Sequence, residues 1–133
     1  MYKIINFDIK GDDRGSLISI EQKKNLPFDI KRVYYIFKSS GNVRRGMHAH
    51  KKLKQLLVAV NGSCKLVIEN GIFKECLLLD SPSKGIYIEE IVWREIYDFS
   101  DDCVLMVLTD DYYNEDDYIR NYEEFKRYVN AKK

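Results

Sequence analysis

The chain has 133 residues, of which 45% are hydrophobic and 32% are charged, and its formal net charge at pH 7 is +1. This length suits a single domain over residues 1–133, which is long enough to bury a core without disulfides or metals. The nearly balanced charge leaves no overall field that would draw the protein to nucleic acid or to an acidic membrane surface.

The N-terminus and the cysteines indicate the cellular compartment. The first residues lack a long apolar segment followed by a small-residue cleavage site, and no run is long and apolar enough to span a membrane. Cys64, Cys76 and Cys103 are odd in number and lack metal-site spacing, so we interpret them as reduced thiols in the core. These features predict a cytoplasmic protein.

Short strands separated by turns account for most of the chain. The predicted strands are rich in β-branched and aromatic residues. We expect them over residues 2–8, 17–21, 31–37, 55–60, 63–69, 72–79, 86–88, 92–99 and 103–108. Asn61-Gly62 and Asn70-Gly71 are strong hairpin signals, because both residue types tolerate the positive φ of a tight turn. The pattern predicts an antiparallel all-β sandwich or barrel.

Alternation along the predicted strand 31–37 separates two different faces. One face carries Arg32, Tyr34 and Ile36, and the other carries Val33, Tyr35 and Phe37. The second face is purely apolar, whereas the first has polar tips. Tyr34 is therefore a candidate pocket residue, with a core tyrosine whose hydroxyl is satisfied as the alternative.

Both histidines of the chain lie in the segment 44–52, between arginines and lysines. In an extended strand, His48 and His50 share one face about 6.5 to 7 Å apart, and Ala49 lies on the other. Because imidazole titrates near neutrality, the pair could supply a base and a proton shuttle, or two metal ligands. Two solvated histidines would show the same pattern.

The C-terminal segment has helical rather than strand periodicity. Asn114 can cap a helix whose first turn is acidic, where carboxylates favour the positive end of the helix dipole. Ile119, Tyr122, Phe125 and Val129 then recur at helical spacing. We predict one amphipathic helix that packs on the sheet or on a partner subunit.

A metal site is the first interpretation of the histidine pair. The spacing of His48, His50, Gln55 and Gly62 resembles the first motif of the cupin superfamily, in which glutamate is expected where Gln55 stands. If the strand 92–99 corresponds to the second motif, Arg94 occupies its ligand position. A third histidine is lacking and a guanidinium repels a divalent cation, so we expect no metal and no other cofactor.

Proton transfer beside a carbonyl suits the same residues better. A carbonyl acidifies the neighbouring C–H, which a histidine near neutrality can remove, and phenolic and cationic donors stabilise the resulting enediolate. Arginines beside the pocket also indicate an anionic substrate, most simply a diphosphate, which a guanidinium binds with paired hydrogen bonds. A solvated basic face is the alternative for these arginines.

Six runs of the sequence carry a more specific resemblance. They are DRGSL (13–17), IKRVYYI (30–36), RGMHAHKKL (45–53), LVAVNGS (57–63), VWRE (92–95) and DYY through DYIRNY (111–122). Together they resemble the thymidine-diphosphate 4-keto-6-deoxyglucose 3,4-ketoisomerases over nearly the whole chain. The resemblance implies a metal-independent cupin jelly roll with a C-terminal helix, in a homodimer that exchanges an N-terminal strand. It also implies conversion of dTDP-4-keto-6-deoxy-D-glucose to a dTDP-3-keto-6-deoxyhexose for the deoxyaminosugars of bacterial surface glycans.

Carried over residue by residue, the resemblance implies catalytic roles for three side chains. His48 and His50 match the family's catalytic histidines, and Tyr34 matches a pocket tyrosine. We expect His48 to remove the proton at C3 and return one to C4, and His50 to relay a proton between the two oxygens. The reverse assignment fits the sequence as well.

Five further residues are expected to bind the substrate. Arg32, Arg45 and Arg94 are assigned to the nucleotide diphosphate and to the electrostatics of the pocket, and Gln55 to a neutral hydrogen-bonding wall. The turn Arg14-Gly15 resembles the branch of the family that delivers the galacto-configured product.

Two other functions remain open from the sequence. One is a cupin epimerase that inverts carbons beside the ketone, as in the 3,5-epimerases, which usually pair a histidine with an aspartate. The aspartates here lie mainly in turns and in the tail. The other is a non-catalytic module that binds a sugar nucleotide.

Overall fold

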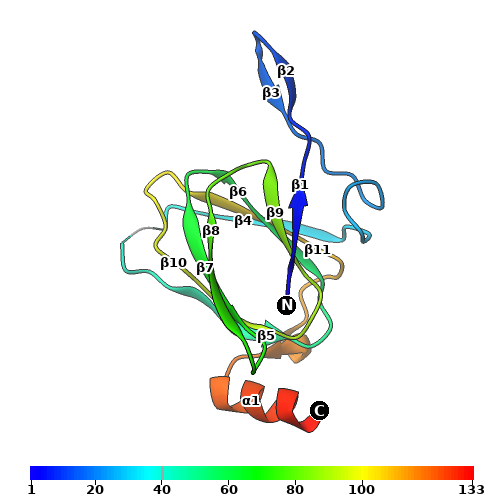
Figure 1. Ribbon diagram of the computed structural model, residues 1–133, viewed down its shortest axis with the longest axis vertical. Helices are drawn as coiled ribbons and strands as arrows, with labels where there is room; N and C mark the ends of the chain where they lie inside the picture. The colour runs from blue at the N-terminus through cyan, green and yellow to red at the C-terminus, as the bar shows by residue number, and fades with distance from the viewer. Residues whose placement is uncertain (40) are drawn as a thin grey trace.

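The computed structural model describes residues 1–39 and 41–133, and two antiparallel sheets facing each other form its body (Figure 1). The first sheet has the order β1 (Lys3–Asn6), β9 (Lys84–Ile88), β6 (Gln55–Asn61), β11 (Val104–Thr109) and β4 (Arg32–Phe37). The second has the order β12 (Tyr118–Ile119), β5 (Arg45–His50), β10 (Trp93–Tyr97), β7 (Cys64–Glu69) and β8 (Lys74–Leu79). This architecture confirms the predicted all-β jelly-roll sandwich.

Two further elements lie outside the sandwich. The strands β2 (Lys10–Asp12) and β3 (Gly15–Leu17) form a separate hairpin, which projects away from the body in Figure 1. The helix α1 (Tyr122–Ala131) lies beside β5 at the opposite end of the picture. No helix in the described part of the chain is long and apolar enough to cross a membrane.

Three apolar clusters hold these layers together. The main core lies between the sheets, where buried residues such as Leu57, Leu66, Ile68, Leu105 and Val107 meet. A second cluster covers part of the outer face of the first sheet and includes Phe7, Leu26, Phe28, Leu56 and Tyr87. The third joins α1 to the second sheet through Ala49, Trp93, Ile119 and Phe125. The helix therefore buries the side of β5 that carries Ala49.

Most predicted strands are present, and the exceptions have local reasons. The strand expected over residues 17–21 is wrong beyond Leu17, because β3 ends there and the chain then lies across the outer face of the first sheet with Ile18 and Ile20 packed on it. Asn70-Gly71 forms the predicted hairpin between β7 and β8. Asn61-Gly62 forms a tight turn, with φ of 64° at Gly62, but it connects β6 to β7 in the other sheet and is not a hairpin.

The apolar face of β4 is its exposed face. Val33, Tyr35 and Phe37 are 52%, 63% and 53% exposed, whereas Tyr34 and Ile36 pack against the main core. The cysteine interpretation is correct for Cys64 and Cys103, which are free and buried. It is wrong for Cys76, which is free but exposed.

Candidate active site

The two histidines share one face of β5, as the alternation predicts. Their ring centroids lie 4.8 Å apart with an interplanar angle of 79°. Ala49, between them, is buried on the opposite face against the α1 cluster. A bulge precedes the pair, because Gly46 is paired with Glu95 and His48 with Arg94, which leaves Met47 unpaired. β-Bulges commonly re-aim side chains beside functional sites.

Each histidine has a defined partner on Nδ1. The Nδ1 atom of His48 lies 3.0 Å from the carbonyl oxygen of Gly46, and that of His50 lies 3.2 Å from Oδ2 of Asp117. Carbonyl and carboxylate oxygens only accept hydrogen bonds, so we assign the ring proton to Nδ1 in both cases. Both Nε2 atoms then carry a lone pair. The Nε2 atom of His50 is buried without a hydrogen-bond partner in the described part of the chain.

The surroundings keep both imidazoles neutral. Burial lowers the pKa of His48 to about 4, with a further contribution from the charge of Arg94. Burial and the same guanidinium lower the pKa of His50 to about 2. At pH 7 both rings are therefore neutral and can act as proton acceptors.

Arg94 lies buried next to the histidines. It is 2% exposed, and its Nη1 donates a hydrogen bond to Oε1 of Gln55. Its Nε and Nη2 have no hydrogen-bond partner among the residues that the structure describes. Burial lowers the pKa of Arg94 to about 10, so it remains a cation at pH 7. The site thus holds a buried positive charge with donors still free for an anion.

Tyr34 adds a phenolic donor to the same region. Burial raises its pKa, so the hydroxyl remains protonated at neutral pH. The guanidinium of Arg32 lies 4.5 Å from the centre of the Tyr34 ring, a distance suited to a cation–π contact.

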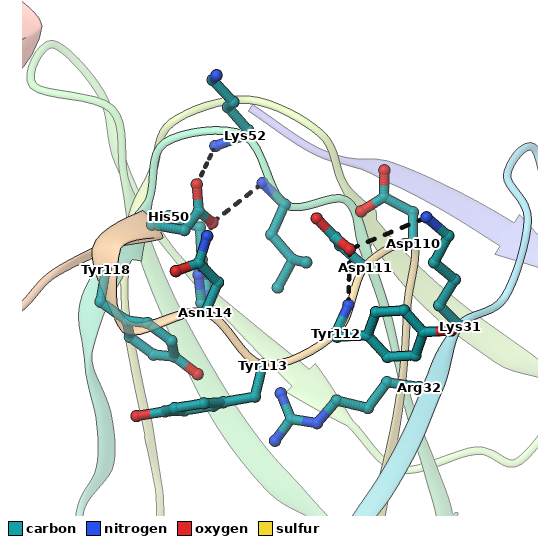
Figure 2. A pocket seen from close by; sticks show the side chains of 12 residues that line it. Lys31, Arg32, His50, Lys52, Asp110, Asp111, Tyr112, Tyr113, Asn114 and Tyr118 are labelled. Carbon is teal, nitrogen blue, oxygen red and sulfur yellow. Dashed lines mark hydrogen bonds and ion pairs between the residues drawn. The ribbon is translucent and has the colours of Figure 1, made fainter.

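A pocket of about 480 Å³ brings most of the predicted site residues together. Its lining includes Arg32, Tyr34, Arg45, His48, Gln55 and Arg94. His50 lines an adjacent pocket of about 300 Å³ (Figure 2), and Tyr118 and Arg32 belong to the linings of both pockets. The two histidines therefore meet at the wall between the two hollows.

Arg14 is the predicted site residue that the structure brings to neither pocket. It lies at the tip of the hairpin β2–β3 with its side chain 87% exposed, and its guanidinium forms an ion pair of 2.5 Å with Asp12. The hairpin projects from the body (Figure 1), so Arg14 lies outside the pocket of its own chain.

The sequence analysis missed three residues of the site because the predicted tail helix is wrong in its first part. Asn114 caps a short 3-10 helix (Glu115–Asp117), which gives way to β12 and then to α1. In β12, Tyr118 pairs with His50, and its ring centroid lies 4.9 Å and 4.3 Å from those of His48 and His50. The same break in the helix brings Asp117 to His50.

Arg120 is the third missed residue. It lines the larger pocket, lies 4.2 Å above the Tyr118 ring, and its Nε forms an ion pair of 2.6 Å with Glu115. A second capping signal could have revealed the break, because Asn121 is followed three residues later by Glu124, and its side chain accepts a hydrogen bond from the Glu124 amide.

The donor set of the site suits proton transfer. Two neutral imidazoles supply acceptors, Tyr34 supplies a hydroxyl, and Arg94 supplies a buried positive charge that can stabilise an oxyanion. Within residues 1–39 and 41–133, no group of three or more His, Cys, Asp or Glu side chains is arranged to hold a metal ion.

Comparisons with known proteins place the chain among sugar-nucleotide enzymes. A family described as FdtA, WxcM-like, C-terminal matches residues 1–130. The TDP-4-oxo-6-deoxy-alpha-D-glucose-3,4-oxoisomerase of Aneurinibacillus thermoaerophilus is 55% identical over 127 residues, which cover 96% of this chain and 91% of that protein.

Two solved structures are similar along nearly their whole length. A 3,4-ketoisomerase from Helicobacter canadensis is 48% identical with a TM-score of 0.94, and the match covers 97% of each chain. A histidine-to-asparagine variant of the 3,4-ketoisomerase QdtA from Thermoanaerobacterium thermosaccharolyticum, in complex with TDP-4-keto-6-deoxyglucose, is 44% identical with a TM-score of 0.95. That match covers 98% of this chain and 94% of the other.

Proposed function

The chain belongs to the WxcM-like FdtA family of sugar-nucleotide 3,4-ketoisomerases, and from this premise we propose that it converts dTDP-4-keto-6-deoxy-D-glucose into a dTDP-3-keto-6-deoxyhexose. The observation that carries the proposal is the pair of neutral imidazoles, with their ring centroids 4.8 Å apart, beside a buried guanidinium. This arrangement provides acceptors for a proton and a charge that stabilises the intermediate in one place.

In the proposed reaction, Nε2 of His48 removes the proton from C3 of the sugar. The C–H electron pair forms the C3–C4 double bond, and the ketone oxygen at C4 becomes an enediolate oxygen. His50 relays the proton of the C3 hydroxyl to the C4 oxygen, after which C4 takes up the proton held by His48. The electron pair of the C3–C4 double bond forms the new C4–H bond, and the C3 oxygen, which has lost its proton, forms the ketone at C3. Atoms and charge therefore balance without an external oxidant.

The positive charge of Arg94 stabilises the enediolate in this proposal. Its buried Nε and Nη2 are available to an anion, and Gln55 orients the guanidinium through Nη1. A preorganised cation in a water-poor site is worth more than the same charge at the surface. Tyr34 supplies a hydroxyl to the sugar, while Arg32 and Arg45 lie on the pocket wall and bind the diphosphate.

We propose that this chemistry needs no metal. A cation bound by the two imidazoles would lie close to the buried charge of Arg94, which opposes it by direct repulsion. Activity should therefore survive exhaustive treatment with a chelator. Loss of activity that an added divalent metal restores would contradict this part of the proposal.

The sequence predicts a homodimer that exchanges an N-terminal strand, and we propose that the exchanged segment is the hairpin β2–β3. Within one chain β1 pairs with β9, but the hairpin β2–β3 projects with Ile9 and Leu17 both 59% exposed. An apolar hollow of about 470 Å³ lies where this arm meets Val58 and Met106 on the outer face of the first sheet. In such a dimer Arg14 would enter the pocket of the partner subunit, and we assign to it the delivery of the galacto-configured product for bacterial surface glycans.

One incubation tests the proposed reaction against both alternatives. The protein is mixed with dTDP-4-keto-6-deoxyglucose in deuterated water, and the sugar is followed by NMR. A ketone moved to C3 supports the proposal, and C4 carries deuterium to the extent that the proton on His48 exchanges with solvent before it is returned. Inversion at C3 or C5 indicates an epimerase, and an unchanged sugar that still binds indicates a binding module. The variant His48→Asn should lose both isomerisation and exchange at C3 while nucleotide affinity changes by no more than about threefold.

A further inference from the structure

One carboxylate of the tail holds both His50 and the loop that follows β5. Oδ1 of Asp117 accepts a hydrogen bond of 2.8 Å from the amide of Lys52, and Oδ2 accepts one of 3.3 Å from the amide of Leu53. The same Oδ2 lies 3.2 Å from Nδ1 of His50. The side chain of Asp117 is 14% exposed, so these contacts are largely shielded from water.

These contacts leave one arrangement of protons on the ring. Each oxygen of Asp117 already accepts from a backbone N–H, which fixes the rotation of the carboxylate. A proton on Nδ1 of His50 completes a hydrogen bond to Oδ2, whereas the opposite tautomer would direct the Nδ1 lone pair at a negatively charged oxygen. The Nδ1–H tautomer is therefore strongly favoured, and it leaves the lone pair on Nε2.

We infer that Asp117 is a positioning residue, which holds His50 in the tautomer whose Nε2 can accept a proton from the sugar. The transfer of a sugar proton to Nε2 rests on the proposed function, whereas the tautomer of His50 can be observed in the protein without substrate. A buried carboxylate behind an imidazole sets the tautomer and orientation of the ring in the same way in serine protease triads.

The variant Asp117→Asn should reverse the tautomer while keeping the size of the side chain. The amide keeps the shorter backbone contact, of 2.8 Å to Lys52, only if its oxygen is on that side, and it then gives up the longer contact, of 3.3 Å to the amide of Leu53. Its NH2 group then faces Nδ1 of His50 and donates to it, so the ring proton moves to Nε2. In this state Nε2 is a donor and cannot accept the proton of a sugar hydroxyl.

The two histidines of the chain make the tautomers directly measurable. The protein is labelled with 15N in histidine, and two-dimensional NMR distinguishes protonated from unprotonated ring nitrogens. The variant His48→Asn leaves only His50 and so assigns the signals. Asp116→Asn is the matched control, because it makes the same change in charge on the exposed neighbour in the same 3-10 helix.

The native protein should show Nδ1–H on both rings. In Asp117→Asn the proton of His50 should move to Nε2, the signals of His48 should keep their pattern, and kcat should fall at least about tenfold with KM within about threefold. This loss is smaller than the roughly 10⁴-fold effect of the equivalent change in a protease triad, because His48 remains in place as the base. Asp116→Asn should change neither the tautomers nor kcat.

Two results would overturn the inference. One is an Nε2–H tautomer for His50 in the native protein, a measurement that stands even if Asp117→Asn does not fold. The other is a reversed tautomer in Asp117→Asn with kcat within about twofold of the native value. If the native protein catalyses no isomerisation, the proposed function fails, whereas the observed tautomer still decides whether Asp117 positions the ring.

Discussion

Acidification from pH 7 to pH 5 should destabilise the fold through the two buried histidines. Their pKa values are about 4 for His48 and about 2 for His50, against about 6.5 in the unfolded chain. A pKa lowered by folding means that the unfolded state binds more protons between these values. Stability is therefore full well above pH 6.5 and is lost as the pH falls below it.

The size of the effect follows from the same values. At pH 5 the unfolded state carries a proton on nearly every histidine, whereas the folded state carries almost none on His50 and about a tenth of one on His48. Each ring then costs about 2 kcal/mol relative to pH 7, or about 4 kcal/mol together. Carboxylates contribute little in this range, because most of them titrate below about pH 4.5.

Urea unfolding at pH 7 and pH 5 measures the loss, at one fixed protein concentration so that any association contributes equally. The variants His48→Gln and His50→Gln should each reduce the difference between the two pH values by about half. A native difference below about 1 kcal/mol would refute the reasoning, since it would mean that both rings titrate as they do in water. A difference that neither variant reduces would assign the loss to other groups.

Three further substitutions test the site and the assembly. Arg94→Met should lower kcat about 10² to 10³-fold while the urea midpoint stays the same or rises, because it removes a buried cation that has no carboxylate partner among the described residues. A lower midpoint with unchanged kcat would contradict both expectations. Tyr34→Phe keeps the ring that Arg32 covers and should lower kcat about tenfold, so an unchanged kcat would show that the hydroxyl is not used. Leu17→Asp should convert a dimer into a monomer in light scattering. Ile72→Asp, which changes a similarly exposed apolar residue in another hairpin, should not.

The parts of the site that sequence reasoning found depend on local periodicity. The backbone of a strand fixes a period of two residues for its side chains. On β4 this period places Tyr34 toward the pocket and Tyr35 away from it. On β5 it places His48 and His50 on the same face. Such patterns need no knowledge of the rest of the fold. The catalytic candidates could therefore be named before the sheets were known.

The parts that it missed depend on contacts between distant segments. Asn61-Gly62 adopts the expected tight turn, but no local signal tells whether the next strand pairs with β6 or crosses to the other sheet. The apolar spacing of the tail fits a continuous helix, but the strand pairing of Tyr118 with His50 on the edge of β5 overrides this local preference. Asp117 could not be linked to His50 without that pairing.

Arg94 was assigned to the pocket from the sequence, but its burial, which is the more informative feature, could not be predicted. Arginine is rarely fully buried, so its sequence position alone favours a solvated or ion-paired side chain. Here it is 2% exposed, and two of its nitrogens and Nε2 of His50 lack partners in the described part of the chain. Unsatisfied buried polar atoms destabilise a fold, and natural proteins keep such violations mainly at functional sites. Their clustering beside one another fits the proposed function, in which the oxygens of a bound substrate would be the missing partners and its negative charge during the reaction would match the free donors of Arg94.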